Sequence, residues 1–220
     1  MNHPATQAPP TPVPHHAIDA IIFDLGGVLV DWNPRYLYRQ IFTSADEMAY
    51  FLTEICSPAW NEEQDRGRSW DEAVRKLQAQ YPQYWNEIAA YHLRWAETLR
   101  GELPETVKLL EQLRQTPLRL LALTNWSQQT FPIARERFGF LQWFEGILVS
   151  GEEGMAKPDQ AIFELMASRY HLTPALTIFI DDSEKNVRAA QEAGYQAIHF
   201  TGAEALRAEL ARFGVVLADG

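Results

Sequence analysis

The chain has 220 residues, of which 46% are hydrophobic and 22% are charged, as is ordinary for a globular protein with one full core and a subsidiary domain. Its formal net charge is −10 and its isoelectric point is about 5.1. Nucleic acids and anionic membrane surfaces attract clustered Lys and Arg, so this balance argues against both as partners. Small molecules are the expected partners.

The number of cysteines and the composition of residues 1–17 indicate the cellular compartment of the protein. The single cysteine, Cys56, excludes an internal disulfide and a metal site of several cysteines, and we expect it to be a buried or half-buried thiol. No apolar stretch approaches the roughly 20 residues that span a bilayer. Residues 1–17 contain five prolines and no Lys or Arg, so we interpret them as a disordered tail rather than a signal or transit peptide. These features favour a cytoplasmic protein.

An apolar run at residues 21–30 predicts the first strand of a buried parallel sheet, since such strands are nearly continuous in Val, Ile, Leu and Phe. The run is interrupted by Asp24 and then by Gly26 and Gly27. Open α/β sheets bind ligands beyond the carboxyl ends of their strands, which is where Asp24 would lie. An Asp shortly before Gly is also common in turns, so this residue alone does not decide between a turn and a site.

From Asp31 to about Gly101 the pattern changes to helical spacing without clear strands. Apolar residues recur at the spacing of one helix face in three groups, which are Tyr38, Ile41 and Phe42, then Met48, Phe51 and Leu52, then Val74, Leu77 and Tyr81. We predict an all-helical cap over 31–101 that folds over the site, because it enters directly after the first strand. Its tryptophans are interpreted as core rather than as ligand-stacking groups: Trp60, Trp70, Trp85 and Trp95.

After the insert, helical and strand patterns alternate to the end of the chain. The predicted elements are helix 104–115, strand 118–123, a helix begun by Ser127, strand 146–150, helix 158–170, strand 176–180, helix 184–193 and strand 196–200. Such alternation is typical of right-handed crossovers and a parallel sheet covered on both faces. We therefore predict a doubly wound α/β core, Rossmann-like in form, built from 18–30 and 102–220.

Polar residues follow the later strands as Asp24 follows the first. Thr124 and Asn125 come after strand 118–123, and Asp181 and Asp182 come after strand 176–180. Lys157 lies between them in the turn Gly-Met-Ala-Lys-Pro. Taken singly, Thr-Asn is a common helix cap and Asp-Asp a common helix N-terminus. Their repeated placement at strand ends favours one shared site.

These four motifs, in this order between Asp24 and Gly194, resemble those of the haloacid dehalogenase superfamily of aspartate-nucleophile hydrolases. The phrase Phe-Asp-Leu-Gly around Asp24 resembles the glucose-1-phosphate phosphatase-like and epoxide hydrolase N-terminal-like branch. The resemblance implies a Rossmann-like core with a helical cap after the first motif. It also implies a Mg²⁺-dependent phosphatase that hydrolyses a small phosphomonoester, such as a sugar phosphate, through an aspartyl-phosphate on Asp24.

The resemblance further implies a role for each matched residue. Catalysis would rest on Asp24, Thr124 and Lys157, and the phosphate would be bound by Thr124, Asn125, Gly27 and Lys157. The metal ligands would be Asp24, Asp182 and the Gly26 carbonyl, with Asp181 acting through water or holding Lys157. Charge gives independent support, because three carboxylates and one lysine leave about two uncompensated negative charges, which a divalent cation would offset.

One position departs from the phosphatase pattern. Phosphatases of the superfamily usually carry a second Asp two residues after the nucleophile, as general acid to the leaving group and then as base for water, and here that residue is Gly26. Losing a positioned acid typically costs about a hundredfold to ten-thousandfold in rate. The leaving oxygen is therefore expected to be acidic, as in a sugar 1-phosphate or an aryl phosphate, unless the cap supplies the acid.

Three further alternatives stay open at this point. Asp65 in the cap is a candidate acid, although its sequence context favours an exposed charge in a turn. A metal-free dehalogenase needs no acid, because halide leaves unprotonated. A protein that binds phosphate with little turnover also needs no general acid. The acidic pair Asp181-Asp182 favours the phosphatase over the dehalogenase, since carboxylates beside an ionised nucleophile need a cation.

Overall fold

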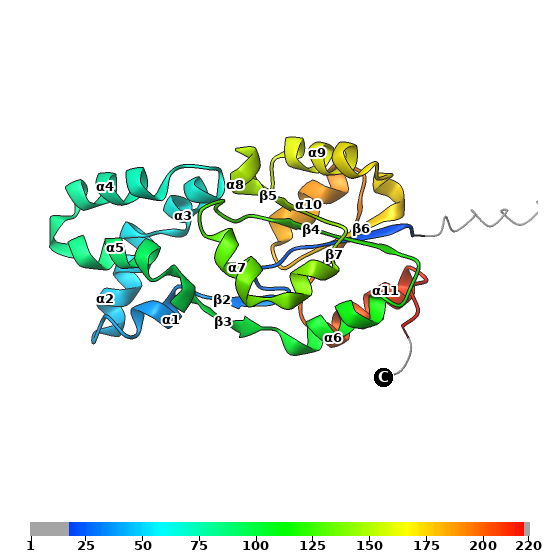
Figure 1. Ribbon diagram of the computed structural model, residues 1–220, viewed down its shortest axis with the longest axis horizontal. Coiled ribbons are helices and arrows are strands. Elements are labelled where there is room, and N and C mark those ends of the chain that lie inside the picture. The colour runs from blue at the N-terminus through cyan, green and yellow to red at the C-terminus, as the bar shows by residue number, and fades with distance from the viewer. Residues whose placement is uncertain (1–17, 218–220) are drawn as a thin grey trace, which may run out of the picture.

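A five-stranded parallel sheet lies at the centre of the computed structural model, which describes residues 18–217 (Figure 1). Its strands, in spatial order, are β5 (Gly146–Val149), β4 (Arg119–Thr124), β1 (Ala20–Phe23), β6 (Thr177–Asp181) and β7 (Gln196–His199). In the register, Ile22 of β1 pairs with Leu121 of β4 and with Phe179 of β6. The predicted doubly wound parallel sheet is confirmed. The interpretation of residues 1–17 as a tail falls outside the described residues.

Helices cover both faces of this sheet, as the alternation of buried side chains along each strand requires. Ile21 and Phe23 pack into one core cluster, whereas Ala20 and Ile22 pack into another. The first cluster includes residues from the core helices α6 (Pro104–Leu113), α7 (Phe131–Arg137) and α11 (Ala203–Arg212), and it continues into the helices that follow β1. The second includes residues from two helices, α9 (Gln160–Tyr170) and α10 (Glu184–Glu192).

The chain order of the strands creates a switch point at β1. From β1 the chain continues to β4 and β5 on one side, and it later returns to β6 and β7 on the other side. The crossover connections therefore diverge at the carboxyl end of β1, and a crevice forms there. Asp24 directly follows β1 and so stands at this crevice.

The segment between β1 and β4 leaves the sheet and forms a helical cap, which we define as residues 33–98. Its helices are α1 (Arg35–Tyr38), α2 (Ala45–Tyr50), the π-helix η1 (Phe51–Ile55), α3 (Pro58–Asp65), α4 (Trp70–Gln80), η2 (Pro82–Tyr84), α5 (Trp85–Leu93) and η3 (Trp95–Thr98). The expectation of no strands over 31–101 is wrong at both ends. There, β2 (Val30–Trp32) pairs antiparallel with β3 (Leu99–Glu102), because the entering and leaving segments run side by side and satisfy each other's backbone groups.

Aromatic rings fill the interior of the cap. Trp70 is fully buried, and its ring centroid lies 5.6 Å from that of Trp60 and 5.5 Å from that of Tyr91. Trp95 is also buried. Trp85, however, is 56% exposed, so its interpretation as core is wrong. It is the first residue of α5, and the turn between α4 and α5 lies at the end of the cap farthest from the sheet (Figure 1).

Side chains of the cap bind the loops at the carboxyl edge of the sheet. Trp70 donates from its indole to Ser127 Oγ at 3.0 Å and from its backbone to Gln129 Oε1 at 2.8 Å. The helix predicted from Ser127 begins only at Phe131, and Ser127 lies in the loop before it. The cap is thereby fixed over the crevice.

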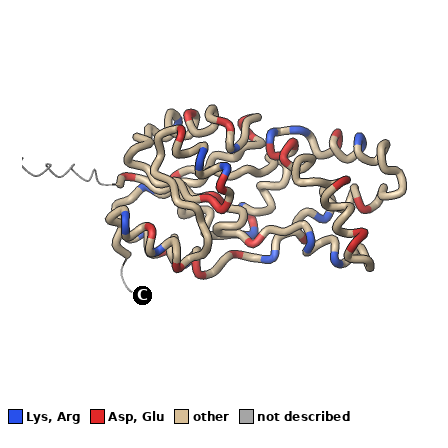
Figure 2. Tube along the Cα trace, turned by 180° about the vertical axis from the view of Figure 1, so that it is seen from behind, with Lys and Arg blue, Asp and Glu red and all other residues tan. Residues whose placement is uncertain are grey.

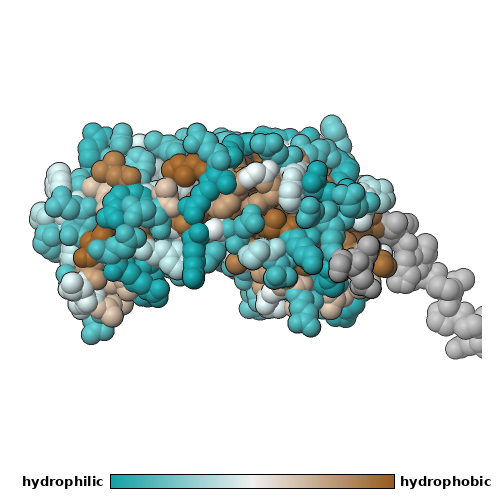
Figure 3. Space-filling view, turned by 60° about the horizontal axis from the view of Figure 1, so that its bottom comes forward, coloured by the Kyte–Doolittle hydropathy of each residue, from teal (hydrophilic) through white to brown (hydrophobic). Residues whose placement is uncertain are grey.

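The outer surface is polar in character. Lys and Arg are interspersed with Asp and Glu over both parts of the molecule rather than gathered in one patch (Figure 2). The space-filling view shows a mainly hydrophilic surface with separate small hydrophobic patches, and the outline is hollowed between cap and core (Figure 3). None of the helices within residues 18–217 is long and apolar enough to cross a membrane.

Candidate active site

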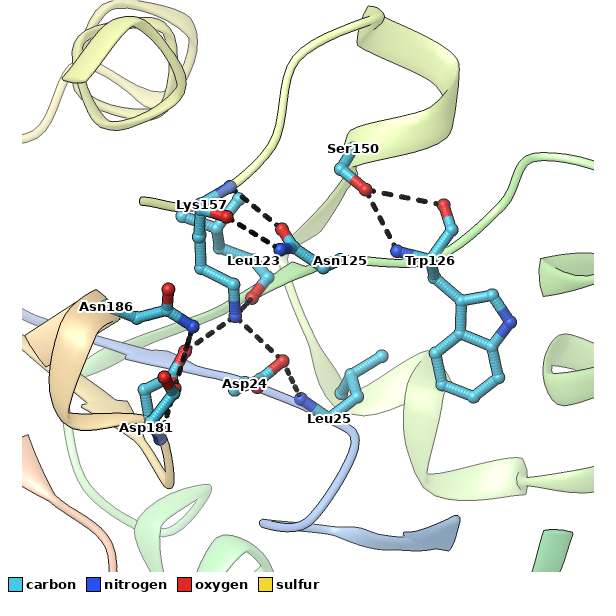
Figure 4. Close-up of polar contacts among 10 residues, drawn as sticks. Asp24, Leu25, Leu123, Asn125, Trp126, Ser150, Lys157, Asp181 and Asn186 are labelled. Carbon is cyan, nitrogen blue, oxygen red and sulfur yellow. Dashed lines mark hydrogen bonds and ion pairs between the residues drawn. The ribbon is translucent and has the colours of Figure 1, made fainter. Parts of the chain in front are cut away.

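The ammonium group of Lys157 joins two carboxylates at the carboxyl edge of the sheet (Figure 4). Its Nζ lies 2.9 Å from Asp24 Oδ1 and 2.7 Å from Asp181 Oδ2, and it donates to the carbonyl of Leu123 at 2.9 Å. The side chain is fully buried, so these three oxygens replace its shell of water. The structure thus brings together residues that the sequence separates by more than a hundred positions.

The charges in this cluster do not balance. Burial alone lowers the pKa of Lys157, but the charges of Asp181 and Asp24 outweigh it and raise that pKa above its ordinary value. Burial raises the pKa of Asp24 to about 7, and the charges of Asp181 and Asp182 add to this rise, whereas Lys157 opposes it. An additional cation at the cluster would favour the ionised form of Asp24 at neutral pH.

The two oxygens of Asp24 differ in their surroundings. Oδ1 accepts from the backbone N–H of Leu25 at 2.7 Å and faces Lys157. Within the described part of the chain, Oδ2 has no hydrogen-bond partner. A carboxylate held through one oxygen leaves the other oxygen as a positioned nucleophile or metal ligand.

Two asparagines hold the charged groups in place. Asn125 accepts from the backbone N–H of Lys157 and donates to its carbonyl, both at 2.9 Å, and so joins the loop after β4 to the lysine turn. Asn186 on α10 donates to both oxygens of Asp181, at 3.0 and 3.1 Å. The amide of Asn125 is thus a positioning group for Lys157, while Thr124 is buried at the end of β4 beside it.

Asp182 and the two glycines after Asp24 meet at the same edge. Gly27 has a φ of +75°, and a Cβ built there would lie 2.2 Å from Asp182 Oδ2. Glycine is therefore required at this position both by the backbone conformation and by the close approach of Asp182. A Cβ built on Gly26, in contrast, would meet nothing within 4 Å.

The carboxylates form a donor set that suits a hard divalent cation. Asp24, Asp181 and Asp182 each offer an oxygen, and these oxygens lie within 4.8 Å of one another. Mg²⁺ prefers oxygen ligands, usually takes one or two carboxylates, and retains several waters. Asp181 is the most occupied of the three, since it already binds Lys157, Asn186 and the N–H of Ser183. The residues present therefore fit Mg²⁺, with Asp24 and Asp182 the freer ligands.

A cavity of about 500 Å³ opens from this cluster toward the cap. Its lining includes Gly26, Asn125 and Asp182 from the core and Asp65 from the end of α3. Asp65 accepts from Asn61 Nδ2 at 3.0 Å and from the backbone N–H of Ser127. Burial raises the pKa of Asp65 to about 7, and the charge of Glu62 adds to the rise. Asp65 is thus a half-buried acid facing the site, and it is not an exposed charge in a turn.

Sequence reasoning missed Asn186 as part of the cluster. It lies five positions after Asp181, at a spacing that places its side chain over the strand end once α10 begins at Glu184. The sequence signal that could have identified Asn186 was an amide side chain in the first turn of the helix after Asp181.

Ser150 was missed as well. Its hydroxyl accepts from Trp126 N at 2.9 Å and donates to the carbonyl of Asp65, so it links cap and core.

The fold and this cluster are those of a hydrolase. Residues 18–194 match the haloacid dehalogenase-like hydrolases, and the chain belongs to this family. The family predicted from the four motifs is therefore confirmed.

Three known proteins illustrate its range. A sesquiterpene phosphatase of Aspergillus oryzae, astK, is 34% identical over 192 residues, which cover 87% of this chain and 94% of the relative. A solved enzyme of the family from Bacteroides thetaiotaomicron, in complex with magnesium and inorganic phosphate, is 22% identical with a TM-score of 0.65, covering 83% of this chain and 93% of that one. An L-2-haloacid dehalogenase is also 22% identical, with a TM-score of 0.63, covering 83% and 86%. At 22% identity, the last two proteins resemble this chain in fold.

Proposed function

We propose that this hydrolase is a Mg²⁺-dependent phosphatase that cleaves a small phosphomonoester through phosphorylation of Asp24. The observation that carries the proposal is the cluster around Lys157, in which Asp24 keeps one oxygen free beside Asp182. The naming of a 34% identical relative as a phosphatase adds support. Asp24, Asp182 and the Gly26 carbonyl would hold the Mg²⁺, with Asp181 acting through water. Bound there, Mg²⁺ would supply Lewis-acid neutralisation of phosphoryl and carboxylate charge.

The reaction divides into two displacements at phosphorus. In the first, Asp24 Oδ2 attacks the phosphorus, a new P–O bond forms, and the bond from phosphorus to the leaving oxygen breaks. In the second, water attacks the phosphorus of the aspartyl-phosphate, which releases inorganic phosphate and restores the Asp24 carboxylate. Lys157, Thr124 and the amides around Gly27 and Asn125 are the groups proposed to bind the phosphoryl oxygens.

Asp65 is proposed as the proton donor that Gly26 does not supply. Its carboxyl group lines the cavity with Gly26 and Asp182, and its raised pKa keeps it partly protonated at neutral pH. A general acid works best when its pKa lies near the operating pH. In the first displacement the Asp65 proton would pass to the leaving oxygen. In the second, the Asp65 carboxylate would accept a proton from the attacking water.

The carboxylate cluster favours this function over the two alternatives. A metal-free dehalogenase has no use for Asp182 beside a nucleophile that must stay ionised, and a protein that only binds phosphate has no use for a free Asp24 oxygen. The test is phosphate release from p-nitrophenyl phosphate with Mg²⁺ and again with EDTA, alongside chloride release from 2-chloropropionate. We expect metal-dependent phosphate release that Asp24→Asn abolishes while the far-ultraviolet circular dichroism is unchanged. Chloride release without metal, or near-normal activity of the variant, would refute the proposal.

A further inference from the structure

The cavity above the active site presents more apolar than polar surface. Its aromatic and aliphatic lining comes mainly from the cap and from the strand that leads into it. These apolar residues are Trp32, Pro34, Leu52, Cys56, Pro58, Tyr91 and Trp95.

The core adds Trp126 to this apolar wall. Its indole extends away from the Asp24–Lys157 cluster (Figure 4), and its ring centroid lies 5.2 Å from that of Trp95. A substrate whose phosphate sits at the cluster would therefore place its organic part among these rings. Aromatic walls of this kind bind apolar groups with large buried area.

The charged side chains of the lining are already engaged. Glu62 on α3 and Lys185 on α10 pair with each other, with Nζ and Oε1 3.0 Å apart. Asp65 is bonded to Asn61 and to the N–H of Ser127, as described above. These charged groups are therefore already paired within the protein and do not depend on the organic part of a substrate for a partner.

A sugar or nucleoside is a poor match for a mainly apolar lining. Its hydroxyl and amide groups would lie against the apolar side chains of the wall, and each polar group that is buried without a hydrogen-bond partner weakens binding.

We infer that the cavity receives an apolar organic group, so that the substrate is the phosphate monoester of a hydrocarbon-rich alcohol rather than of a carbohydrate or nucleoside. This inference rests on the proposed phosphatase function. A volume of about 500 Å³ is within the range of pockets that enclose a whole small ligand. Each methylene group moved from water into such a pocket strengthens binding about fourfold, until the pocket is full.

The test uses straight-chain alkylphosphonates, from ethyl to decyl, as competitive inhibitors of p-nitrophenyl phosphate hydrolysis with Mg²⁺. Phosphonates carry no cleavable ester bond, so the result is independent of the leaving-group acid. We expect the inhibition constant to fall about fourfold per methylene along the series. Glucose 1-phosphate and a nucleoside monophosphate should inhibit no better than ethylphosphonate. A constant that does not change along the series, or tighter inhibition by the sugar or nucleotide than by hexylphosphonate, overturns the inference.

A pair of variants locates the effect in the cavity. Trp32 lines the cavity and is 36% exposed, so Trp32→Ser should keep the fold while it weakens octylphosphonate at least fivefold and leaves ethylphosphonate within twofold. Trp85→Ser, at an exposed tryptophan outside the lining, is the matched control and should leave both constants unchanged. Equal effects of the two variants would overturn the assignment. If p-nitrophenyl phosphate is not hydrolysed at all, the proposed function fails, and calorimetric titration with the same phosphonates still decides the present inference.

Discussion

Replacement of Asp65 by Asn tests the origin of the leaving-group proton. Asn keeps the size of the side chain and one acceptor oxygen for the bond from Asn61 or Ser127, so the α3 terminus should stay in place. A positioned general acid contributes about a hundredfold to ten-thousandfold in rate. We expect a loss of that size with butyl phosphate, whose alkoxide leaving group needs a proton. With p-nitrophenyl phosphate, whose leaving group is stable without one, we expect a loss of less than about threefold.

The pH dependence gives the same reasoning a second readout. Burial raises the pKa of Asp65 to about 7, so the carboxyl group is protonated below pH 7 and loses its proton as the pH rises through that value. Hydrolysis of butyl phosphate by the unmodified enzyme should therefore decline above about pH 7, and Asp65→Asn should remove this decline. The stability of the fold depends on the same pKa. Because the pKa of Asp65 is higher in the folded than in the unfolded protein, ionisation of Asp65 lowers the free energy of unfolding as the pH rises. The variant should be more stable than the unmodified protein at pH 8 by at most about 4 kcal/mol, and equally stable at pH 3.

A second substitution controls for damage to the site. A Cβ on Gly26 meets nothing within 4 Å and the residue does not have a positive φ, so Gly26→Asp fits without strain. In the Asp65→Asn background it should restore butyl phosphate hydrolysis at least tenfold, because it supplies an acid two residues after the nucleophile. Equal losses with both substrates in Asp65→Asn, together with no recovery in the double variant, would show that Asp65 is structural and not a proton donor.

Three other predictions concern the charged cluster. Lys157→Met should lower the free energy of unfolding in urea at pH 8 by about 3–5 kcal/mol, because it leaves Asp24 and Asp181 buried without their cation; a change below 1 kcal/mol would contradict the pairing. Gly27→Ala should weaken Mg²⁺ binding in calorimetry and cost about 1–3 kcal/mol of stability, since its Cβ would collide with Asp182; unchanged affinity would count against Asp182 as a ligand. Mg²⁺ at a hundred times its dissociation constant should stabilise the fold by about 2.7 kcal/mol, and EDTA should reverse this; equal melting temperatures would argue against a metal site.

The sheet was predictable because its strands carry a local pattern. Buried parallel strands are continuous apolar runs, and the runs at 118–123 and 176–180 lie within a residue or so of β4 and β6. The polar residues at their ends then followed from the geometry of parallel sheets. Two helices were not predicted. The helix α8 (Ser150–Glu153) is too short to show a period, whereas α11 at the end of the chain buries Leu206 and Leu210 at helical spacing and was missed despite that pattern.

Contacts between distant segments were not predictable from local pattern. Asn125 makes two hydrogen bonds with the backbone of Lys157, 32 positions away, and the local sequence of neither segment predicts them. The environment of Asp65 was hidden for the same reason. Its half-buried position depends on the loop that carries Ser127, which arrives from another part of the chain. The exposure of Trp85 likewise depends on whether another segment packs against the start of α5, which the local sequence does not show.

The antiparallel pairing of β2 with β3 limits how substrate can reach the cavity. Both chain crossings between cap and sheet run through this one ribbon, so the cap has a single axis about which to rotate. The helix α3 lies away from this ribbon (Figure 1). On α3 Glu62 pairs with Lys185, and directly after α3 Arg66 pairs with Asp159. Any opening of the cap about this ribbon would part these partly exposed ion pairs, and salt would weaken them far more than it weakens the buried pairs of Lys157.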